Sequence, residues 1–181
     1  FGGTCLNVGC IPTKMYVYAA AIALAAREAG RLGLDAQVNS VDWNSIVDRV
    51  FNNRIDQIAQ GGEQYRRGEE TPNITVYDEH ARFVGPKTIQ TGNHVISGDQ
   101  IVIAAGSRPV IPEVYADSGI KYYTNEDIMR MDHQPESLIV VGGGYIAMEF
   151  AHVFDGLGTK VTVVNRSETL LRHLDDDISR R

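Results

Sequence analysis

The sequence predicts an α/β fold built from two units, each incomplete, with a small antiparallel β-meander. Three observations lead to this prediction. Two stretches with helix-forming composition and spacing come first. Short runs rich in β-branched residues follow, separated by Gly85-Pro86 and Gly92-Asn93. The third observation is an apolar run that leads through a glycine cluster into a helical stretch and a second apolar run.

Two helices are expected in the first part of the chain. The first runs from Met15 to about Arg31 and stops at Gly33. Asp42 is a suitable N-cap for the second helix, which reaches about Gln64. The apolar residues of this second helix that fall near helical spacing are Ile46, Val50, Ile55 and Ile58.

The β-rich runs come next in the chain. They are Ile74–Tyr77, Ala81–Val84, Thr88–Thr91, His94–Ser97 and Gln100–Ala104. We interpret them as an antiparallel meander that leads into one buried strand, Ile101–Ala105.

A linker with Pro109 and Pro112 then places the boundary between the two units near Arg108–Pro112. Beyond it, a strand Leu138–Val141, a helix to about Leu157 and a strand Lys160–Val164 form the opening of a βαβ unit.

The composition is that of an acidic globular protein. The 181 residues include 17 Lys or Arg and 23 Asp or Glu, for a formal net charge of −6. A pI near 5.3 without a basic run argues against nucleic-acid binding. The longest apolar stretch, Val17–Ala26, is about half the length that a membrane span needs. No charged-then-apolar leader opens the chain, so we expect a cytoplasmic protein without a membrane partner. Because the chain starts at Phe1 and stops just after the second unit has opened, we expect a piece of a longer protein.

Cys5 and Cys10 are the only cysteines, and they lie at the entrance to the first helix. In a regular α-helix, residues five apart are separated by about 7.5 Å of rise and roughly 140° of rotation. A disulfide needs Cα atoms within about 4.4–6.8 Å, so this pair can bond only if the turn is irregular. Gly9 and Pro12 provide that irregularity. In a chain without a secretory signal, an oxidisable pair is more typical of catalysis than of structure, and a helix N-terminus is expected to lower a thiol pKa. Two unrelated buried thiols remain the alternative.

The glycine cluster has the G-x-G-x-x-A form of a dinucleotide-binding fingerprint, with Gly142, Gly144 and Ala147 at its three positions. The first glycine permits a tight turn, and the second lets a pyrophosphate approach the backbone. The small third residue lets the helix pack closely on the strand, with the phosphates over the helix N-terminus.

The end of the second strand indicates which dinucleotide is bound. An acidic residue there would bind the ribose 2′-hydroxyl of NAD. This chain has Asn165, followed by Arg166 and later Arg172, which favours a 2′-phosphate and therefore NADPH. NADH is the alternative nucleotide. The competing interpretation is that the two arginines are ordinary solvated surface residues without a role in nucleotide binding.

Two sequence strings together carry a family resemblance. They are Gly2-Gly3-Thr4-Cys5-Leu6-Asn7-Val8-Gly9-Cys10-Ile11-Pro12-Thr13-Lys14 and Gly142-Gly143-Gly144-Tyr145-Ile146-Ala147-Met148-Glu149. The chain closely resembles the class I pyridine nucleotide–disulfide oxidoreductases. The resemblance implies two nested Rossmann-like units: a partial FAD-binding domain over residues 1–108 and a partial NADPH-binding domain over residues 109–181. It also implies that the N-terminal FAD fingerprint and the C-terminal dimerisation domain are missing from this chain, which by itself is expected to be inactive.

The resemblance further implies roles for individual residues. Cys5 would be the thiol that attacks the disulfide substrate, and Cys10 the thiolate against the flavin. Lys14, paired with Glu149, would lie near the flavin N5 edge, where a lysine ammonium favours the anionic reduced flavin. The residues expected to line FAD are Gly3, Thr4, Lys14, His80, Ala81, Ala105 and Gly106, and those expected to line NADPH are Gly142, Gly144, Tyr145, Ile146, Ala147, Glu149, Arg166 and Arg172. The other histidines, His94, His133, His152 and His173, show no partnered pattern.

The expected reaction is electron transfer from NADPH through FAD and a Cys5–Cys10 disulfide to a small disulfide substrate. The tracts after Lys14 and after Val163 are most similar to those of mycothione reductases, which favours mycothione as the substrate. A dihydrolipoamide dehydrogenase is the alternative, although Thr13 and Asn165 depart from that branch. The family implies a homodimer whose acid–base histidine lies outside this chain. A non-catalytic dinucleotide-binding module and a cysteine-based redox-sensing regulator are the other classes considered.

Overall fold

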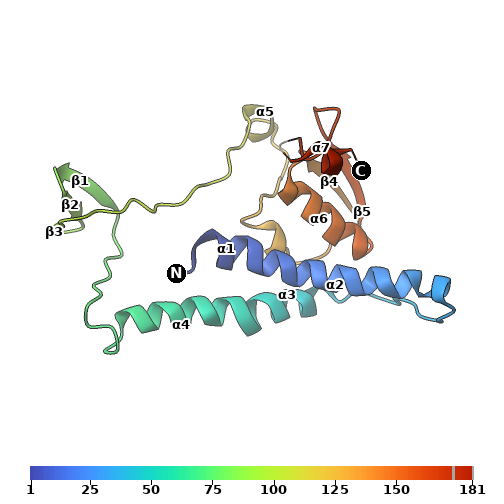
Figure 1. The fold of residues 1–181 in the computed structure, drawn as a ribbon, viewed down its shortest axis with the longest axis horizontal. Coiled ribbons are helices and arrows are strands. Elements are labelled where there is room, and N and C mark those ends of the chain that lie inside the picture. Colours follow the sequence, from blue (N-terminus) through green and yellow to red (C-terminus); the bar gives the residue numbers. More distant parts are fainter. Residues whose placement is uncertain (173, 181) are drawn as a thin grey trace. The chain divides into compact units, whose positions relative to one another are not determined.

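The computed structural model describes residues 1–172 and 174–180. The chain divides into two compact units, which we describe separately. The larger contains Gly2–Gln57 and Pro109–Arg181, and the smaller contains Ile58–Arg108 together with Phe1. The chain therefore passes from one unit to the other after Gln57 and returns after Arg108 (Figure 1). The assignment of residues 1–108 and 109–181 to two cofactor-binding domains stays a prediction.

The first expected helix is present and begins earlier than predicted. A short helix α1 (Gly3–Val8) is followed after Gly9 by the long helix α2 (Cys10–Glu28) and a 3₁₀ turn, η1 (Ala29–Leu32). The run ends at Gly33, whose φ of 77° is the left-handed conformation that glycine adopts at helix ends, as the sequence predicted.

The second expected helix is also present, but it is interrupted. It consists of α3 (Trp43–Val50), a π-helical turn η2 (Phe51–Ile55) and α4 (Asp56–Arg67). Asp42 is its N-cap, as predicted, because its carboxylate accepts a hydrogen bond from the Ser45 amide at 3.0 Å. The wide turn was not predicted. Val50, Phe51 and Ile55 are all buried around this turn. Because Val50 and Phe51 are adjacent, this set does not follow regular α-helical spacing.

The later part of the larger unit contains the predicted βαβ opening. Strand β4 (Ser137–Val141) leads to helix α6 (Tyr145–Gly156) and then to strand β5 (Lys160–Val164). The two strands pair in parallel, with Ser137 opposite Lys160 and Val141 opposite Val164. Among the described residues, this part also contains three short helical segments: α5 (Glu113–Ala116), the 3₁₀ turn η3 (Ile128–Arg130) and α7 (Asp176–Ser179).

Helices α2 and α6 pack side by side at the centre of the larger unit (Figure 1). A Cβ added to Gly156 would lie only 2.8 Å from the Cβ of Ala20, so the two helices cross in close contact at these small residues. Around this crossing, Trp43 packs its ring against those of Tyr16 and Phe154, at centroid distances of 5.3 Å and 5.4 Å. The first helix and the βαβ opening therefore share one hydrophobic core.

The helical run Gly3–Leu32 is long and apolar enough to cross a membrane by length and composition, with a mean hydropathy of 1.4. Core helices of soluble proteins and signal sequences meet the same criterion, so this is weak evidence for a membrane span. Tyr16 and Ala20 within this run are fully buried in the protein core.

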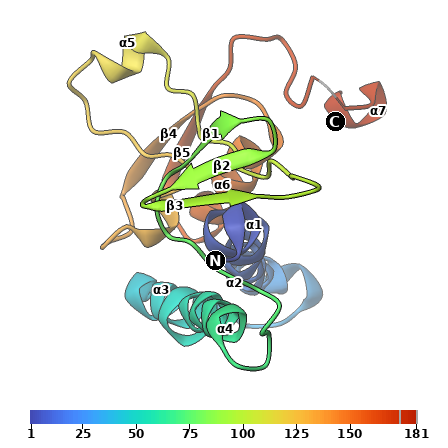
Figure 2. The same cartoon turned by 90° about the vertical axis from the view of Figure 1, so that its left-hand side faces the viewer.

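The smaller unit contains the predicted meander. Its strands β1 (Ala81–Gly85), β2 (Thr88–Thr91) and β3 (His94–Ser97) form an antiparallel sheet in the order β1-β2-β3 (Figure 2).

Two runs that were predicted as strands are not strands. Ile74–Tyr77 and the buried strand Ile101–Ala105 have no strand assignment, and Val102 and Ile103 are 85% and 76% exposed. A β-strand needs a neighbouring strand for its backbone hydrogen bonds, and within the described residues neither run has one.

Candidate active site

The cysteine turn, which we define as residues 4–13, brings the two thiols together. Cys5 lies in α1, and Cys10 is the first residue of α2. Gly9 separates the two helices with φ −141° and ψ −125°. A Cβ at this position would lie 2.8 Å from the Thr4 carbonyl oxygen and 3.3 Å from the Cys5 Cα. This is the irregular turn that the cysteine spacing required, and only glycine permits so close an approach of the two backbone segments.

Both cysteines are exposed and carry free thiols. A side-chain hydrogen bond with Cys10 raises the pKa of the Cys5 thiol, because it stabilises the protonated form. Hydrogen bonds from the backbone amides of Cys10 and Ile11 act in the opposite direction. The expectation that a helix N-terminus lowers the thiol pKa is therefore wrong for Cys5, since the contact between the thiols outweighs the backbone amides. The pair is accessible to a substrate and close enough for its members to interact.

Lys14 and Glu149 form an ion pair between α2 and α6. Lys14 lies one turn after Cys10, and its side chain is 65% exposed, whereas that of Glu149 is 31% exposed. Without the family resemblance these two residues are ordinary charged helix residues far apart in the sequence. The structure brings them together beside the cysteine turn.

A shallow cavity of about 510 Å³ adjoins Cys10. Its lining residues from α2 are Cys10, Ile11, Lys14, Met15 and Tyr18, and those from the following helical segments are Arg49 and Arg54. The cavity thus combines a thiol, an apolar wall and positive charge, which suits a ligand with an anionic group on an apolar body. Sequence reasoning missed Arg49 and Arg54 because nothing in their spacing relates them to Cys10. Their position depends on how α3 and η2 pack along α2.

The glycine turn between β4 and α6 is open beside its backbone. Gly142 has a φ of 127°, and its amide donates to the Val164 carbonyl at 2.9 Å. Added Cβ atoms at Gly142 and Gly144 would meet nothing within 4 Å, so open space lies beside the backbone there. Gly144 caps α6 without a side-chain hydrogen bond. The amides of the first turn are thus left for an anion, and the residues present fit a pyrophosphate.

The first turn of α6 contains three more of the predicted nucleotide-binding residues. Tyr145 is the first residue of the helix and is 70% exposed, Ile146 is also exposed, and Ala147 is partly buried. The role of Tyr145 beside a bound nucleotide stays a prediction.

Asn165 stabilises the loop that follows β5, a role that the sequence did not indicate. Its side-chain amide donates to the carbonyls of Ser167 and Thr169 at 2.8 Å and 3.0 Å. It also packs against Gly143, where an added Cβ would lie 2.9 Å from its amide group. Asn165 thereby shapes the loop after β5, on which Arg166 is exposed. Arg172, at the far end of this loop, is exposed as well.

The model of one protein family, described as "Pyridine nucleotide-disulphide oxidoreductase", matches residues 1–181. The chain belongs to this family. The proposed resemblance on the cysteine and glycine strings is thereby confirmed, and so is the mixed α/β class of the fold.

Several members of this oxidoreductase family are similar to the chain over its whole length. Mycothione reductase from Mycobacterium tuberculosis (strain ATCC 25618 / H37Rv) is 52% identical over 100% of this chain and 40% of its own length. Glutathione reductase from Burkholderia cepacia is 33% identical over 98% of the chain and 38% of its own length. Dihydrolipoyl dehydrogenase from Bacillus subtilis (strain 168) is 31% identical over 99% of the chain and 40% of its own length. The chain therefore spans about two fifths of the length of these relatives.

A solved structure of the same kind is also similar in fold. The HOCl-induced flavoprotein disulfide reductase RclA from Escherichia coli superimposes with a TM-score of 0.76 at 28% identity. The match covers 99% of this chain and 37% of that one.

The residues predicted to line the flavin are found in both units. Gly3, with φ 61°, and Thr4 are exposed in the larger unit beside Cys5. Lys14 lies in the same unit, whereas His80, Ala81, Ala105 and Gly106 are exposed in the smaller unit. Gly106 has φ 72°, and an added Cβ would meet nothing within 4 Å, as at Gly3. Both glycines thus leave the backbone open to a ligand, which fits the flavin cofactor within each unit.

The remaining histidines lie far from the two cysteines in the sequence. His94 packs its ring on Tyr77 at 5.3 Å, and His133 contacts the neighbouring Asp132, whose pKa it lowers. His152 is exposed on α6. His173 lies outside the described residues.

Proposed function

We propose that the full-length protein is a flavoprotein disulfide reductase that uses NADPH and FAD, with Cys5 and Cys10 as its redox pair. The observation that carries this proposal is the cysteine turn. Two exposed thiols interact across Gly9 at the start of α2, and the Lys14–Glu149 pair lies one helical turn away. A buried structural disulfide or two unrelated thiols would not need an accessible, closely approaching pair.

Mycothione is the substrate that we propose. The 52% identity to a mycothione reductase stands well above the 33% to a glutathione reductase and the 31% to a dihydrolipoyl dehydrogenase. The three comparisons cover nearly the same residues, so the difference reflects similarity across this part of the chain.

The chemistry of the two thiols balances as a pair of exchange steps. The Cys5 thiolate attacks one sulfur of the substrate disulfide, which forms a mixed disulfide and releases the first substrate thiol. Cys10 then attacks the Cys5 sulfur, which releases the second thiol and leaves a Cys5–Cys10 disulfide. Bound FAD, once reduced by NADPH, would supply the two electrons that return this disulfide to the dithiol. Lys14, held by Glu149, would place a positive charge beside that cofactor.

NADPH is the nucleotide that we propose for the glycine turn. The open space at Gly142 and Gly144 and the uncapped start of α6 suit its pyrophosphate. Arg166 is exposed on the loop that Asn165 holds, where a guanidinium can bind a 2′-phosphate. We further propose that the full-length protein is a homodimer, by analogy with its family, and is cytoplasmic, because redox-active cysteines of this kind work in a reducing compartment.

The proposal is tested with the full-length, FAD-loaded protein. NADPH oxidation is followed with mycothione, glutathione disulfide or lipoamide as the acceptor, and then with NADH in place of NADPH. We expect turnover with mycothione and a preference for NADPH. A preference for lipoamide with NADH would instead assign the protein to the dihydrolipoyl dehydrogenases.

Two variants separate the roles of the cysteines. In Cys10→Ser the second exchange step is blocked, so Cys5 should accumulate as a mixed disulfide with the substrate thiol, detectable by mass spectrometry. In Cys5→Ser no such adduct should form. Disulfide turnover that survives both substitutions would show that the cysteines are incidental and that this is a different kind of dinucleotide-binding protein.

A further inference from the structure

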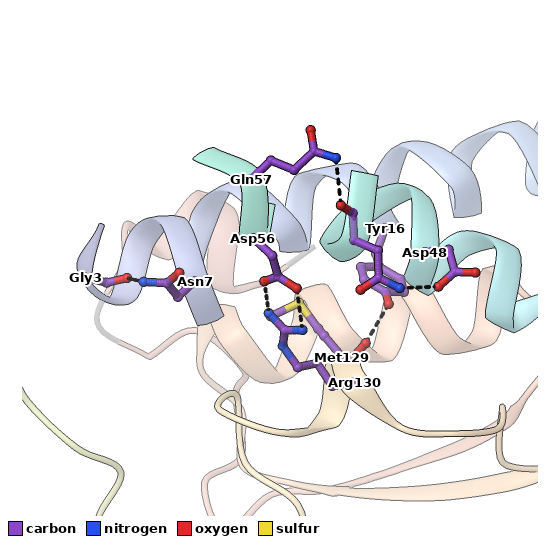
Figure 3. Close-up of polar contacts among 9 residues, drawn as sticks. Gly3, Asn7, Tyr16, Asp48, Asp56, Gln57, Met129 and Arg130 are labelled. Atoms are coloured by element: carbon purple, nitrogen blue, oxygen red, sulfur yellow. Dashed lines mark hydrogen bonds and ion pairs between the residues drawn. The ribbon is translucent and has the colours of Figure 1, made fainter. Parts of the chain in front are cut away.

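A segment that precedes β4 contacts the cysteine turn, and we define this strap as Thr124–Met131. It supplies contacts to three preceding helical elements. The Tyr16 hydroxyl donates to the Met129 carbonyl at 2.6 Å, and the Trp43 ring nitrogen donates to the Met131 carbonyl at 2.8 Å. Arg130 forms an ion pair with Asp56 (Figure 3). The side chains of Ile128, Met129 and Met131 are buried in the core, so the strap is anchored along its second half.

Asn125 lies in the first half of the strap, next to the cysteine turn. Its side-chain amide donates to the carbonyl of Val8 at 3.1 Å, a contact between residues 117 apart in the sequence. Val8 is the last residue of α1, the helix that contains Cys5. The last carbonyls of a helix have no partner within the helix, so the amide of Asn125 satisfies one that would otherwise face water.

The local structure of the strap holds Asn125 in this position. The Thr124 amide donates to the Asp127 carboxylate at 2.6 Å, and the Glu126 amide donates to the Thr124 hydroxyl at 3.1 Å. The Ile128 amide donates to the Thr124 carbonyl at 3.0 Å, which closes the turn around Asn125. These hydrogen bonds fix the backbone on both sides of Asn125 without the contribution of its side chain.

The same junction is held from its other side by α2. The Gly9 carbonyl accepts from the Thr13 amide at 3.1 Å, and the Thr13 hydroxyl contacts the sulfur of Met129 at 3.6 Å. The peptide units on both sides of the break between α1 and α2 are thus tied, one of them by α2 itself and the other by Asn125. Loss of the Asn125 amide would free the end of α1, and with it the position of Cys5 relative to Cys10.

We propose that Asn125 is a positioning residue for the redox pair, which holds α1 so that the Cys5 and Cys10 sulfurs stay within reach of each other. This inference rests on the proposed function, in which the pair cycles between dithiol and disulfide. Two thiols that are held together oxidise to an intramolecular disulfide more readily than two that must first be brought together. Removal of the Asn125 donor therefore shifts the pair towards the dithiol.

The test is a redox titration of the full-length, FAD-loaded protein against mixtures of dithiothreitol and its cyclic disulfide. In this exchange the two cysteines lose two electrons and two protons to the cyclic disulfide, which becomes dithiothreitol. The dithiol and disulfide fractions are read by alkylation of free thiols and mass spectrometry. In Asn125→Ala and Asn125→Asp we expect the equilibrium constant for disulfide formation to fall by about three- to tenfold, the range of one neutral hydrogen bond.

Glu126→Gln is the matched control, because Glu126 is the next residue of the strap and its side chain is exposed. It should titrate as the wild type does. Melting temperatures of all variants are measured alongside, and Asn125→Ser provides a smaller change if the aspartate variant does not fold. Equal titration curves for the wild type and Asn125→Ala would overturn the positioning role, even if the variant melts at a lower temperature. A wild-type protein whose cysteines do not cycle reversibly would instead overturn the proposed function.

Discussion

A side-chain hydrogen bond with Cys10 is the largest cause that raises the pKa of the Cys5 thiol above its ordinary value. Replacement of the partner by alanine removes the leading cause of the shift, while the backbone amides that stabilise the thiolate remain. We therefore expect Cys10→Ala to lower the pKa of Cys5, so that its alkylation by iodoacetamide becomes fast at a lower pH than in the reduced wild type. The control is Tyr18→Phe, a substitution of an exposed residue on α2, the helix that contains Cys10. The same pH midpoint in Cys10→Ala and the wild type would contradict this account.

Gly9 permits the backbone contact on which the cysteine pair depends. In Gly9→Ala the new methyl group would lie 2.8 Å from a backbone oxygen of Thr4, which cannot move without distorting α1. We expect a loss of about 1–3 kcal/mol in the free energy of unfolding, measured by urea denaturation of the full-length protein. Gly30→Ala is the matched control, because an added Cβ at Gly30 meets nothing within 4 Å. Equal losses in the two variants would show that the close approach at Gly9 has no special cost.

At the scale of helices, the crossing of α2 and α6 depends on two small residues. In Gly156→Ala the added methyl group would lie 2.8 Å from the Ala20 side chain, so the helices must separate. In Gly61→Ala, within α4, the methyl group meets nothing within 4 Å and the substitution favours a helix by up to about 1 kcal/mol. We expect the first variant to melt at a lower temperature than the wild type and the second at a higher one. Shifts of the same sign would contradict this interpretation.

The start of α3 is sensitive to pH through its cap. Hydrogen bonds from the Ser45 side chain and then its amide lower the pKa of Asp42. A carboxyl with a lowered pKa in the folded state contributes stability above its unfolded pKa and loses it as the pH falls through the folded value. We therefore expect Asp42→Ala to melt a few degrees below the wild type at neutral pH, with a smaller difference in acid. Asp42→Asn, which keeps a capping oxygen, should melt near the wild type, and a difference that does not shrink in acid would exclude the carboxylate as its source.

At the scale of the whole molecule, the Lys14–Glu149 pair joins the helix that follows the cysteines to the helix that follows the glycine turn. Because Lys14 is largely exposed, the pair contributes less than about 1 kcal/mol to folding. A positive charge beside a reacting cofactor is worth more to catalysis than to stability. In the full-length protein we expect Lys14→Met to lower kcat for disulfide reduction at least about tenfold with little change in melting temperature. Arg31→Met, at a surface ion pair on η1, should change neither. Unchanged kcat in Lys14→Met would contradict a role beside the cofactor.

The predicted elements that agree with the structure are those whose signals lie within a few residues. Asp42 caps a helix, Gly33 ends one, and the two apolar runs around the glycine turn form parallel strands. The predictions that were wrong concern segments whose conformation depends on contacts with residues far away in the sequence. Ile101–Ala105 has strand composition but no neighbouring strand among the described residues, and the π-helical turn at Phe51 follows from what the side chains pack against.

By itself, the sequence determined the helices, the meander, the glycine turn and the two chemically informative strings, because caps, turns and periodicity act over short distances. The ion pair between Lys14 and Glu149 could be expected only through the family. The tertiary structure alone decided the contact of Asn125 with Val8, the two arginines beside Cys10 and the direction of the Cys5 pKa shift. These depend on distances between atoms that folding brings together, and neither spacing nor composition encodes such distances.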